Sequence, residues 1–208
     1  NYFDEWMMCH PYPEDFRNSI CKTTKADMNW FFDQWMETTK TIDYAVTKVK
    51  KVRKTKDQYK ITFKRIGKMQ MPIDFTVFSK DSSSKSYYIP NTWFEKKTSA
   101  TTLPRWIGWD KVKPTYTATV TIPGGIENVV IDTTHRLADV YGVNNSSNKN
   151  VTVSLDSKIF NLPDRNNYEV FYRPAIWYNG FDGVKFGAHA NGNYMGIKNV
   201  FDATVWFN

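Results

Sequence analysis

The chain has 208 residues, a formal net charge of +7, and 41% hydrophobic and 16% aromatic residues. This length and aromatic content are enough for the core of one or two domains, and they exclude a disordered chain. The positive charge permits acidic partners without requiring one.

The two ends of the sequence predict a piece of a longer protein. The chain opens on Asn1 and "YFDEW", without an initiating Met or a signal peptide, and it stops directly after the aromatic "VWF". No apolar run approaches the roughly 20 residues of a membrane-spanning helix. Cys9 and Cys21 fit neither a disulfide framework nor a C-x-x-C motif, so we expect two buried thiols.

Residues 1–41 are predicted to be helical. In "PEDF", Pro13 suits a first helical position, and the two acidic residues after it suit the positive end of the helix dipole. A second helix over 27–38 begins near Asp27, a good N-cap. Its apolar stripe consists of Met28, Phe31, Phe32, Trp35 and Met36. We expect Phe31 and Trp35 to be buried, and Trp30, which lies off the stripe, to be partly exposed.

Residues 42–146 change to a two-residue period and predict an antiparallel β-sandwich. "QYKITFKR", "MPIDFTVF", "TYTATVTI" and "IENVVID" read as strands without intervening helices. The side chains expected to point inward are Tyr59, Ile61, Phe63, Val77, Tyr116, Val120 and Val130. "IPGGIE" predicts a turn with positive φ at Gly124 and Gly125, and "SKDSSSKS" (79–86) predicts a loop tip with fast amide exchange.

Residues 147–208 are predicted to be a linker followed by a β-rich aromatic tail. The polar "NNSSNKN" (144–150) marks the linker, and Asn-Gly at 179–180 and Asp-Gly at 182–183 predict turns. "VKFGAHA" and "NVFDATVWF" read as the arms of a hairpin with "NGNYMG" as its loop. Beyond residue 168 we expect paired β-structure, whose open edge would recruit another copy of the chain if nothing covers it. The predicted fold class is therefore α+β and mostly β.

The sequence contains no recognisable catalytic or metal-binding set. His10, His135 and His189 fall in different segments and form no H-E-x-x-H motif, and no P-loop, G-x-S-x-G or G-x-G-x-x-G motif occurs. We therefore predict no catalytic or metal-ligating residue and no bound zinc in this chain. "NGFDG" predicts a turn, because it lacks the ligand density of a calcium loop.

The basic run "KVKKVRKTK" (48–56) is interpreted as the solvated end of a β-hairpin. It leads directly into the strand at Tyr59 and is interrupted by valines, so we predict no nucleic-acid partner. The N-x-S/T sequons at Asn144, Asn145 and Asn150 matter only in a eukaryotic secretory context.

Two stretches resemble the last helices of the catalytic domain in the aminopeptidase N family of zinc metallopeptidases. "HPYPEDF" (10–16) is similar to the family's "TPEDF" helix start, and "DMNWFFDQWMETTKTIDY" (27–44) to its "DLDWFFDQWL" helix, after which the family's chain enters a β-sandwich. The departures are Tyr12 in place of a Thr or Ser cap and Lys25 in place of a closing Gly. The strands around "MPIDF" and "IENVVIDTTHRLADV" (126–140) also resemble the family, with Thr133 in place of its usual Pro.

This resemblance implies that the parent protein is a hydrolase, an aminopeptidase with zinc, whose catalytic residues all lie N-terminal to Asn1. The chain itself would be a non-catalytic C-terminal fragment that supports the upstream catalytic domain, its main partner, in the periplasm or cell envelope. The tail "YRPAIWYNGFDGVKFGAHANGNYM" looks like one found on large bacterial envelope members of the family.

Two alternatives remain open at this point. One is a free-standing envelope module that binds a peptide or glycan in a groove lined by Trp177, Tyr178 and Phe181. The other is an interaction or membrane-associated element, because "VKFGAHA" and "VFDATVWF" alternate and carry aromatic residues near their ends, as strands in membranes do.

Overall fold

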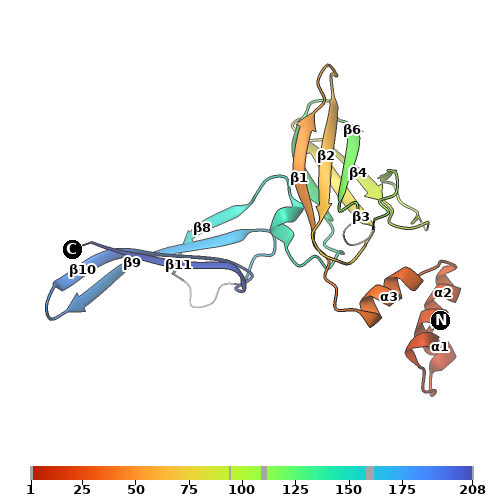
Figure 1. Cartoon of the computed structure of the whole chain (residues 1–208), viewed down its shortest axis with the longest axis horizontal. Helices are drawn as coiled ribbons and strands as arrows, with labels where there is room; N and C mark the ends of the chain where they lie inside the picture. The colour runs from red at the N-terminus through yellow and green to blue at the C-terminus, as the bar shows by residue number, and fades with distance from the viewer. Residues whose placement is uncertain (1, 94, 109–111, 158–161, 208) are drawn as a thin grey trace. The chain divides into compact units, whose positions relative to one another are not determined.

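The computed structural model describes residues 2–93, 95–108, 112–157 and 162–207. The chain divides into two compact units, unit 1 over residues 1–140 and unit 2 over residues 141–208. Short helices come first and strands make up most of the remaining chain, so the predicted fold class, α+β and mostly β, is confirmed (Figure 1).

Three helices open unit 1: α1 (Tyr2–Trp6), α2 (Pro13–Thr24) and α3 (Asn29–Glu37). Pro13 begins α2 as predicted, and the Asp15 carboxylate accepts the Tyr12 backbone N–H at 2.9 Å. Lys25 follows α2 with a φ of 52°, the left-handed conformation that glycine adopts most easily. The Asp27 carboxylate accepts the Asn29 backbone N–H at 3.0 Å at the start of α3.

The predicted helix is present in α3, but its burial differs from the prediction. Phe32 is the buried residue, Phe31 is half-buried, and Trp35 is 41% exposed. Phe16 of α2 packs edge-on against Phe32, with 5.7 Å between the ring centroids, and Arg17 pairs with Asp33 at 3.0 Å. The expectation for Trp35 was therefore wrong, because α2 covers only the part of the apolar stripe that lies over Phe32.

Replacing Phe32 by alanine is expected to destabilise the helical segment by about 3–5 kcal/mol, because the change empties a packed aromatic site. Trp35→Ala, in the exposed part of the same stripe, should cost no more than about 1 kcal/mol. Thermal unfolding followed by far-UV circular dichroism compares the two variants. Equal losses would show that Trp35 is as enclosed as Phe32.

The cysteine prediction was also wrong, because Cys9 is exposed and Cys21 half-buried, and both thiols are free. Cys9 lies in the short connection between α1 and α2, where little chain surrounds it. Trp30 is half-buried, in agreement with its predicted partial exposure.

The rest of unit 1 is a sandwich of two sheets. One has the order β1-β2-β6, formed by Tyr44–Lys51, Gln58–Arg65 and Thr115–Thr121. The other has the order β5-β4-β3-β7, formed by Thr101–Thr102, Ser84–Ile89, Ile73–Ser79 and Ile126–Ile131. All neighbouring strands are antiparallel except β4 and β5. Phe63 of β2 meets Phe75 of β3 at 4.6 Å between ring centroids, so the two sheets share one core.

The predicted inward face holds for six of its seven residues. Ile61, Phe63, Val77 and Val120 are buried, and Tyr59 and Tyr116 are half-buried and pack against the core. Val130 is the exception, because Val129 and Ile131 enter the core instead. Val129 pairs in register with the buried Val77, and paired residues lie on the same face of a sheet.

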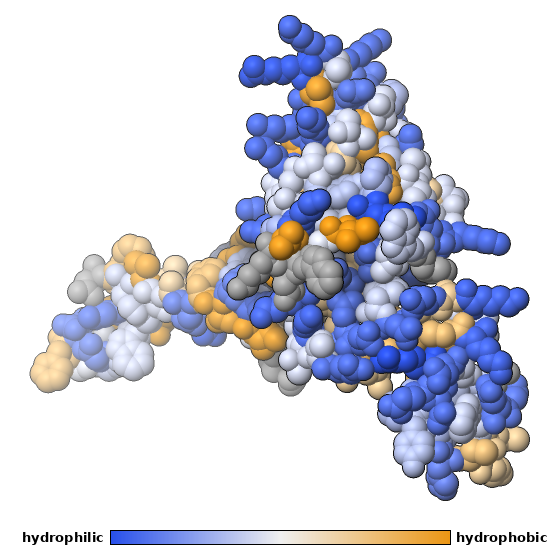
Figure 2. Space-filling model, turned by 45° about the vertical axis from the view of Figure 1, so that its right-hand side comes forward, coloured by the Kyte–Doolittle hydropathy of each residue, from blue (hydrophilic) through white to orange (hydrophobic). Residues whose placement is uncertain are grey.

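The connections between strands agree with most of the turn predictions. Gly124 and Gly125 have φ values of 81° and 91°. The basic run occupies the end of β1 and the turn into β2, and Figure 2 shows hydrophilic side chains crowding this end of the sandwich. The predicted loop 79–86 is shorter than expected, because β4 begins at Ser84 and Ser86 pairs with Thr76 of β3.

A buried polar cluster closes one end of the sandwich. The backbone N–H of Tyr44 donates to the Asp139 carboxylate at 2.9 Å. The side-chain hydroxyl of Tyr44 accepts the Met71 backbone N–H at 2.9 Å. Burial raises the pKa of the Tyr44 hydroxyl, partly offset by the backbone of Met71 and the positive charge of Arg65. Arg65 is itself buried, with its guanidinium 5.8 Å from the centroid of the Trp106 ring.

Tyrosine burial predicts a loss of stability at alkaline pH. Burial raises the pKa values of Tyr44 and Tyr87 above their ordinary 10.0, so folding favours the neutral hydroxyls. Their contribution to stability is fully present below about pH 10 and is lost as the pH rises through the raised pKa values. The Tyr87 hydroxyl is buried without a hydrogen-bond partner among the described residues.

At neutral pH, Tyr87→Phe should therefore leave the free energy of unfolding unchanged or raise it by up to about 1 kcal/mol, because it removes that unsatisfied hydroxyl. Its advantage over the wild-type chain should grow above pH 10. Urea unfolding of both chains at several pH values measures this difference, and an advantage that shrinks as the pH rises would contradict the assignment.

Unit 2 is a single sheet with the strand order β11-β10-β9-β8. A short 3₁₀-helix (Gly142–Asn145) precedes β8 (Val151–Leu155), β9 (Tyr168–Asn179), β10 (Gly183–Tyr194) and β11 (Lys198–Phe207). The paired β-structure beyond residue 168 and the final hairpin are confirmed, although the hairpin loop is only 195–197 because β10 runs on to Tyr194. Strand β8, which pairs parallel to β9, was not predicted.

Candidate interaction surfaces

The sheet of unit 2 has one apolar face. Phe186 pairs with Ile176 on one side and with Phe207 on the other, so all three point to the same face. Following this register and the alternation of each strand gives the exposed residues of what we call the apolar face. They are Val151, Val153, Leu155, Tyr172, Ile176, Tyr178, Val184, Phe186, Phe201, Val205 and Phe207.

All eleven of these side chains are exposed. Exposure runs from 41% for Phe201 to 69% for Ile176 and Tyr178. Large apolar side chains offer roughly 150–250 Å² each, so the face leaves roughly 1,000 Å² of apolar surface in contact with solvent. A typical monomer has no apolar patch larger than about 600 Å². Figure 2 shows orange, hydrophobic patches along unit 2.

The opposite face of the same sheet carries most of the charged side chains of β9, β10 and β11. His189 of β10 pairs with Arg173 of β9 and Thr204 of β11, and its Nδ1 lies 2.9 Å from the Thr204 hydroxyl. Its Nε2 lies 3.6 Å from the Asp202 carboxylate. Lys185 pairs with Asp182 at 2.9 Å. We call this second surface the polar face, because the ionic groups of the hairpin gather on it.

Strand β11 forms one edge of this sheet in the described part of the chain. No strand lies on its outer side among the described residues, which is the condition under which the sequence predicts recruitment of another copy. Recruitment of a second copy through this edge remains a prediction.

A second set of exposed apolar side chains lies on the helical segment. It consists of Phe3, Met7, Met8, Tyr12, Phe16, Trp35 and Met36. The neighbouring Trp30 has an indole N–H that is buried without a hydrogen-bond acceptor among the described residues. The segment is attached to the sandwich by Gln34, whose side chain donates to the Gln70 carbonyl at 3.0 Å and accepts its N–H at 2.7 Å.

The three aromatic residues proposed for a ligand groove are not brought together. Trp177 and Tyr178 are consecutive in β9 and therefore point to opposite faces. Phe181 lies in the turn before β10 and is fully exposed. Only Tyr178 belongs to the apolar face.

The three histidines lie in three separate places. His10 is exposed between α1 and α2, His135 is exposed after β7 with a φ of 54°, and His189 lies on the polar face of unit 2. Among the residues that the structure describes, no three His, Cys, Asp or Glu side chains are grouped closely enough to hold a metal ion.

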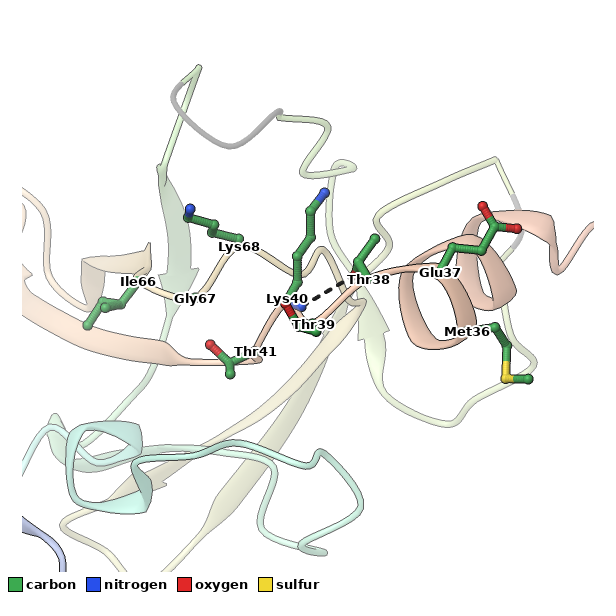
Figure 3. Close-up of a pocket in the computed structure, with 9 residues that line it drawn as sticks. All are labelled: Met36, Glu37, Thr38, Thr39, Lys40, Thr41, Ile66, Gly67 and Lys68. Carbon is green, nitrogen blue, oxygen red and sulfur yellow. Dashed lines mark hydrogen bonds between the residues drawn. The ribbon is translucent and has the colours of Figure 1, made fainter.

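A shallow pocket of about 850 Å³ lies where the chain passes from α3 into β1. Residues 36–41 and 66–68 line it, and Figure 3 shows their side chains fanning outward without converging on a common point. A Cβ added at Gly67 would lie 2.3 Å from the Thr41 carbonyl oxygen, so the two segments are in tight contact. We assign this pocket to chain packing and not to a ligand.

No known protein family, curated protein or solved structure matches the chain. Across the described ranges, no helix is both long enough and apolar enough to cross a membrane.

The alternation in β10 and β11 is visible in the sequence, but the apolar face is not. The apolar positions of "YEVFYRPAIWYN" lie beside those of the two hairpin arms only when the three strands are placed in register. The apolar face could therefore be predicted only from the three strands together.

Proposed function

We propose that this chain is a non-catalytic supporting element of a larger zinc metallopeptidase of the aminopeptidase N type in the cell envelope. In this role, the helical segment packs against an upstream catalytic domain, and the sandwich holds the segment from the other side. The similarity of "PEDF" and "DMNWFFDQW" to the last helices of such a domain supports the assignment. Zinc would be bound by the upstream domain and not by this chain.

The observation that carries the proposal is the incomplete burial of the helical segment. Its helices enclose Phe32 but leave Trp35 exposed, and the Trp30 N–H has no acceptor among the described residues. Buried tryptophan N–H groups usually find a partner. A further domain packed here would cover the aromatic rings and supply that acceptor.

The attachment of α3 to the sandwich fits the same role. Gln34 bonds both backbone groups of Gln70, in the loop between β2 and β3, so the position of the helix follows the position of the sandwich. Arg17 adds a link between α2 and α3 through Asp33 and Glu37, each at 3.0 Å. A domain resting on the helices would thus be supported by the core of unit 1.

Trp35→Ala tests this role when it is measured in two proteins. One is the present chain, and the other is the same chain extended by the residues that its gene encodes before Asn1. The substitution should cost no more than about 1 kcal/mol in the present chain and about 3 kcal/mol in the extended one, where the ring would be buried. Phe78→Ala, on the outer face of β3, is the matched control and should have the same small effect in both. Equal small effects of Trp35→Ala would exclude the packing proposed here.

A further inference from the structure

We propose that the apolar face of unit 2 binds the hydrocarbon of a lipid bilayer. This inference is independent of the supporting role of unit 1. Charged side chains are unequally distributed between the two faces of this sheet. Between the β-bulge after Gly192 and the far end of the hairpin, the apolar face contains no charged side chain in the described strands. Arg173, Lys185 and Asp202 all lie on the opposite face. An exposed apolar face of this size marks a site of contact with a membrane or with another protein.

The length of the apolar face matches the thickness of a bilayer core. Along β9 it runs from Val170 to Tyr178, nine residues that span roughly 27 Å at about 3.3 Å per residue. A strand that crosses the hydrocarbon core of a bilayer is tilted by about 45° and needs about 9–11 residues, so nine residues are enough for one crossing.

The distribution of side-chain size distinguishes lipid from a second protein surface. Ala188, Ala190 and Ala203 occupy the middle of the face. The larger rings lie toward its two ends, with Tyr178, Phe186 and Phe207 at one end and Tyr168 and Phe201 toward the other; Tyr172, in the row of Ala190, is the exception. Protein interfaces concentrate aromatic anchors near the centre, whereas strands in membranes carry them at the two water interfaces.

The two edges of the sheet set a condition on this arrangement, because β11 and β8 are its outer strands. Backbone N–H and C=O groups in hydrocarbon have to be paired, so the lipid-bound sheet is expected to pair both β11 and β8 with further strands. The polar His189, Asn191 and Thr204 would remain on the side away from lipid.

Flotation of the full chain with phosphatidylcholine vesicles tests the proposal. These vesicles carry no net charge, so the +7 charge of the chain gives no general attraction. We expect the wild-type chain to float with the vesicles at low and at high salt. Phe186→Asp and, separately, Ile176→Asp should each reduce the bound fraction at least about tenfold, because each places a charge in hydrocarbon.

Trp177→Asp is the matched control, because Trp177 is adjacent to Ile176 in β9, is 58% exposed and lies on the polar face. It should bind like the wild-type chain, and circular dichroism should show that all three variants fold. Failure of the wild-type chain to float, or equal binding by the Phe186→Asp and Trp177→Asp variants, would overturn the proposal. So would a lipid-free dimer that Phe186→Asp dissociates, because the face would then be covered by a second copy.

Discussion

Replacing Phe63 by alanine is expected to lower the free energy of unfolding of the sandwich by about 3–5 kcal/mol. Phe63 is completely buried at the meeting point of the two sheets, 4.6 Å from Phe75 between ring centroids. Phe75 in turn stacks on Tyr87 at 5.0 Å. The substitution removes the first ring of this stack, and strands on both sides limit the collapse of the resulting cavity. Urea unfolding followed by tryptophan fluorescence measures the loss.

Phe78→Ala is the control for this prediction. Phe78 is in β3, like Phe75, but it points to the outer face and is 36% exposed. Its substitution should cost no more than about 1 kcal/mol. Similar losses at positions 63 and 78 would mean that the two sheets do not share a core at Phe63.

Asp139→Ala is expected to lower the free energy of unfolding by about 3 kcal/mol, the second large effect. The Asp139 carboxylate is buried and accepts the Tyr44 N–H at 2.9 Å, so its removal leaves a buried donor without that acceptor. It also removes a negative charge from a site that contains the buried Arg65. The midpoint of urea unfolding is the measurement.

Asp139→Asn separates the two contributions, because the amide retains an oxygen acceptor for Tyr44 and loses only the charge. We expect Asp139→Asn to lower the free energy of unfolding, but by less than Asp139→Ala. An alanine variant as stable as the wild-type chain would show that the Asp139 contact contributes nothing to the fold.

Periodicity predicted most of the fold because most strands bury one face. The alternation in "QYKITFKR" and "TYTATVTI" identifies the inward residues without knowledge of their partners. It fails for "IENVVI", where two adjacent valines give no preference, and the choice of Val129 follows from its pairing with Val77. Strand β8 was missed although "VTVSL" alternates apolar and polar residues; it is a run of only five residues, all exposed, that pairs with β9.

The candidate surfaces depend on how separate segments of the chain pack and pair, which the sequence of one segment does not show. The stripe of α3 predicts one apolar side, but which part of it is covered depends on the position of Phe16 in α2. Likewise, the apolar face of unit 2 arises from the register of four strands. Tyr178 and Phe186 belong to one surface only because β9 and β10 pair around the turn that contains Phe181.

The supporting role is tested most directly by measuring zinc content and the cleavage of an aminoacyl reporter peptide. Hydrolysis by a zinc enzyme needs a metal with an open position and a general base. We expect the present chain to bind no stoichiometric zinc and to leave the reporter intact, and the chain extended upstream to bind one zinc and cleave it. One equivalent of zinc in the present chain, with activity abolished by His189→Ala or His135→Ala, would contradict the supporting role and make this chain an enzyme in its own right.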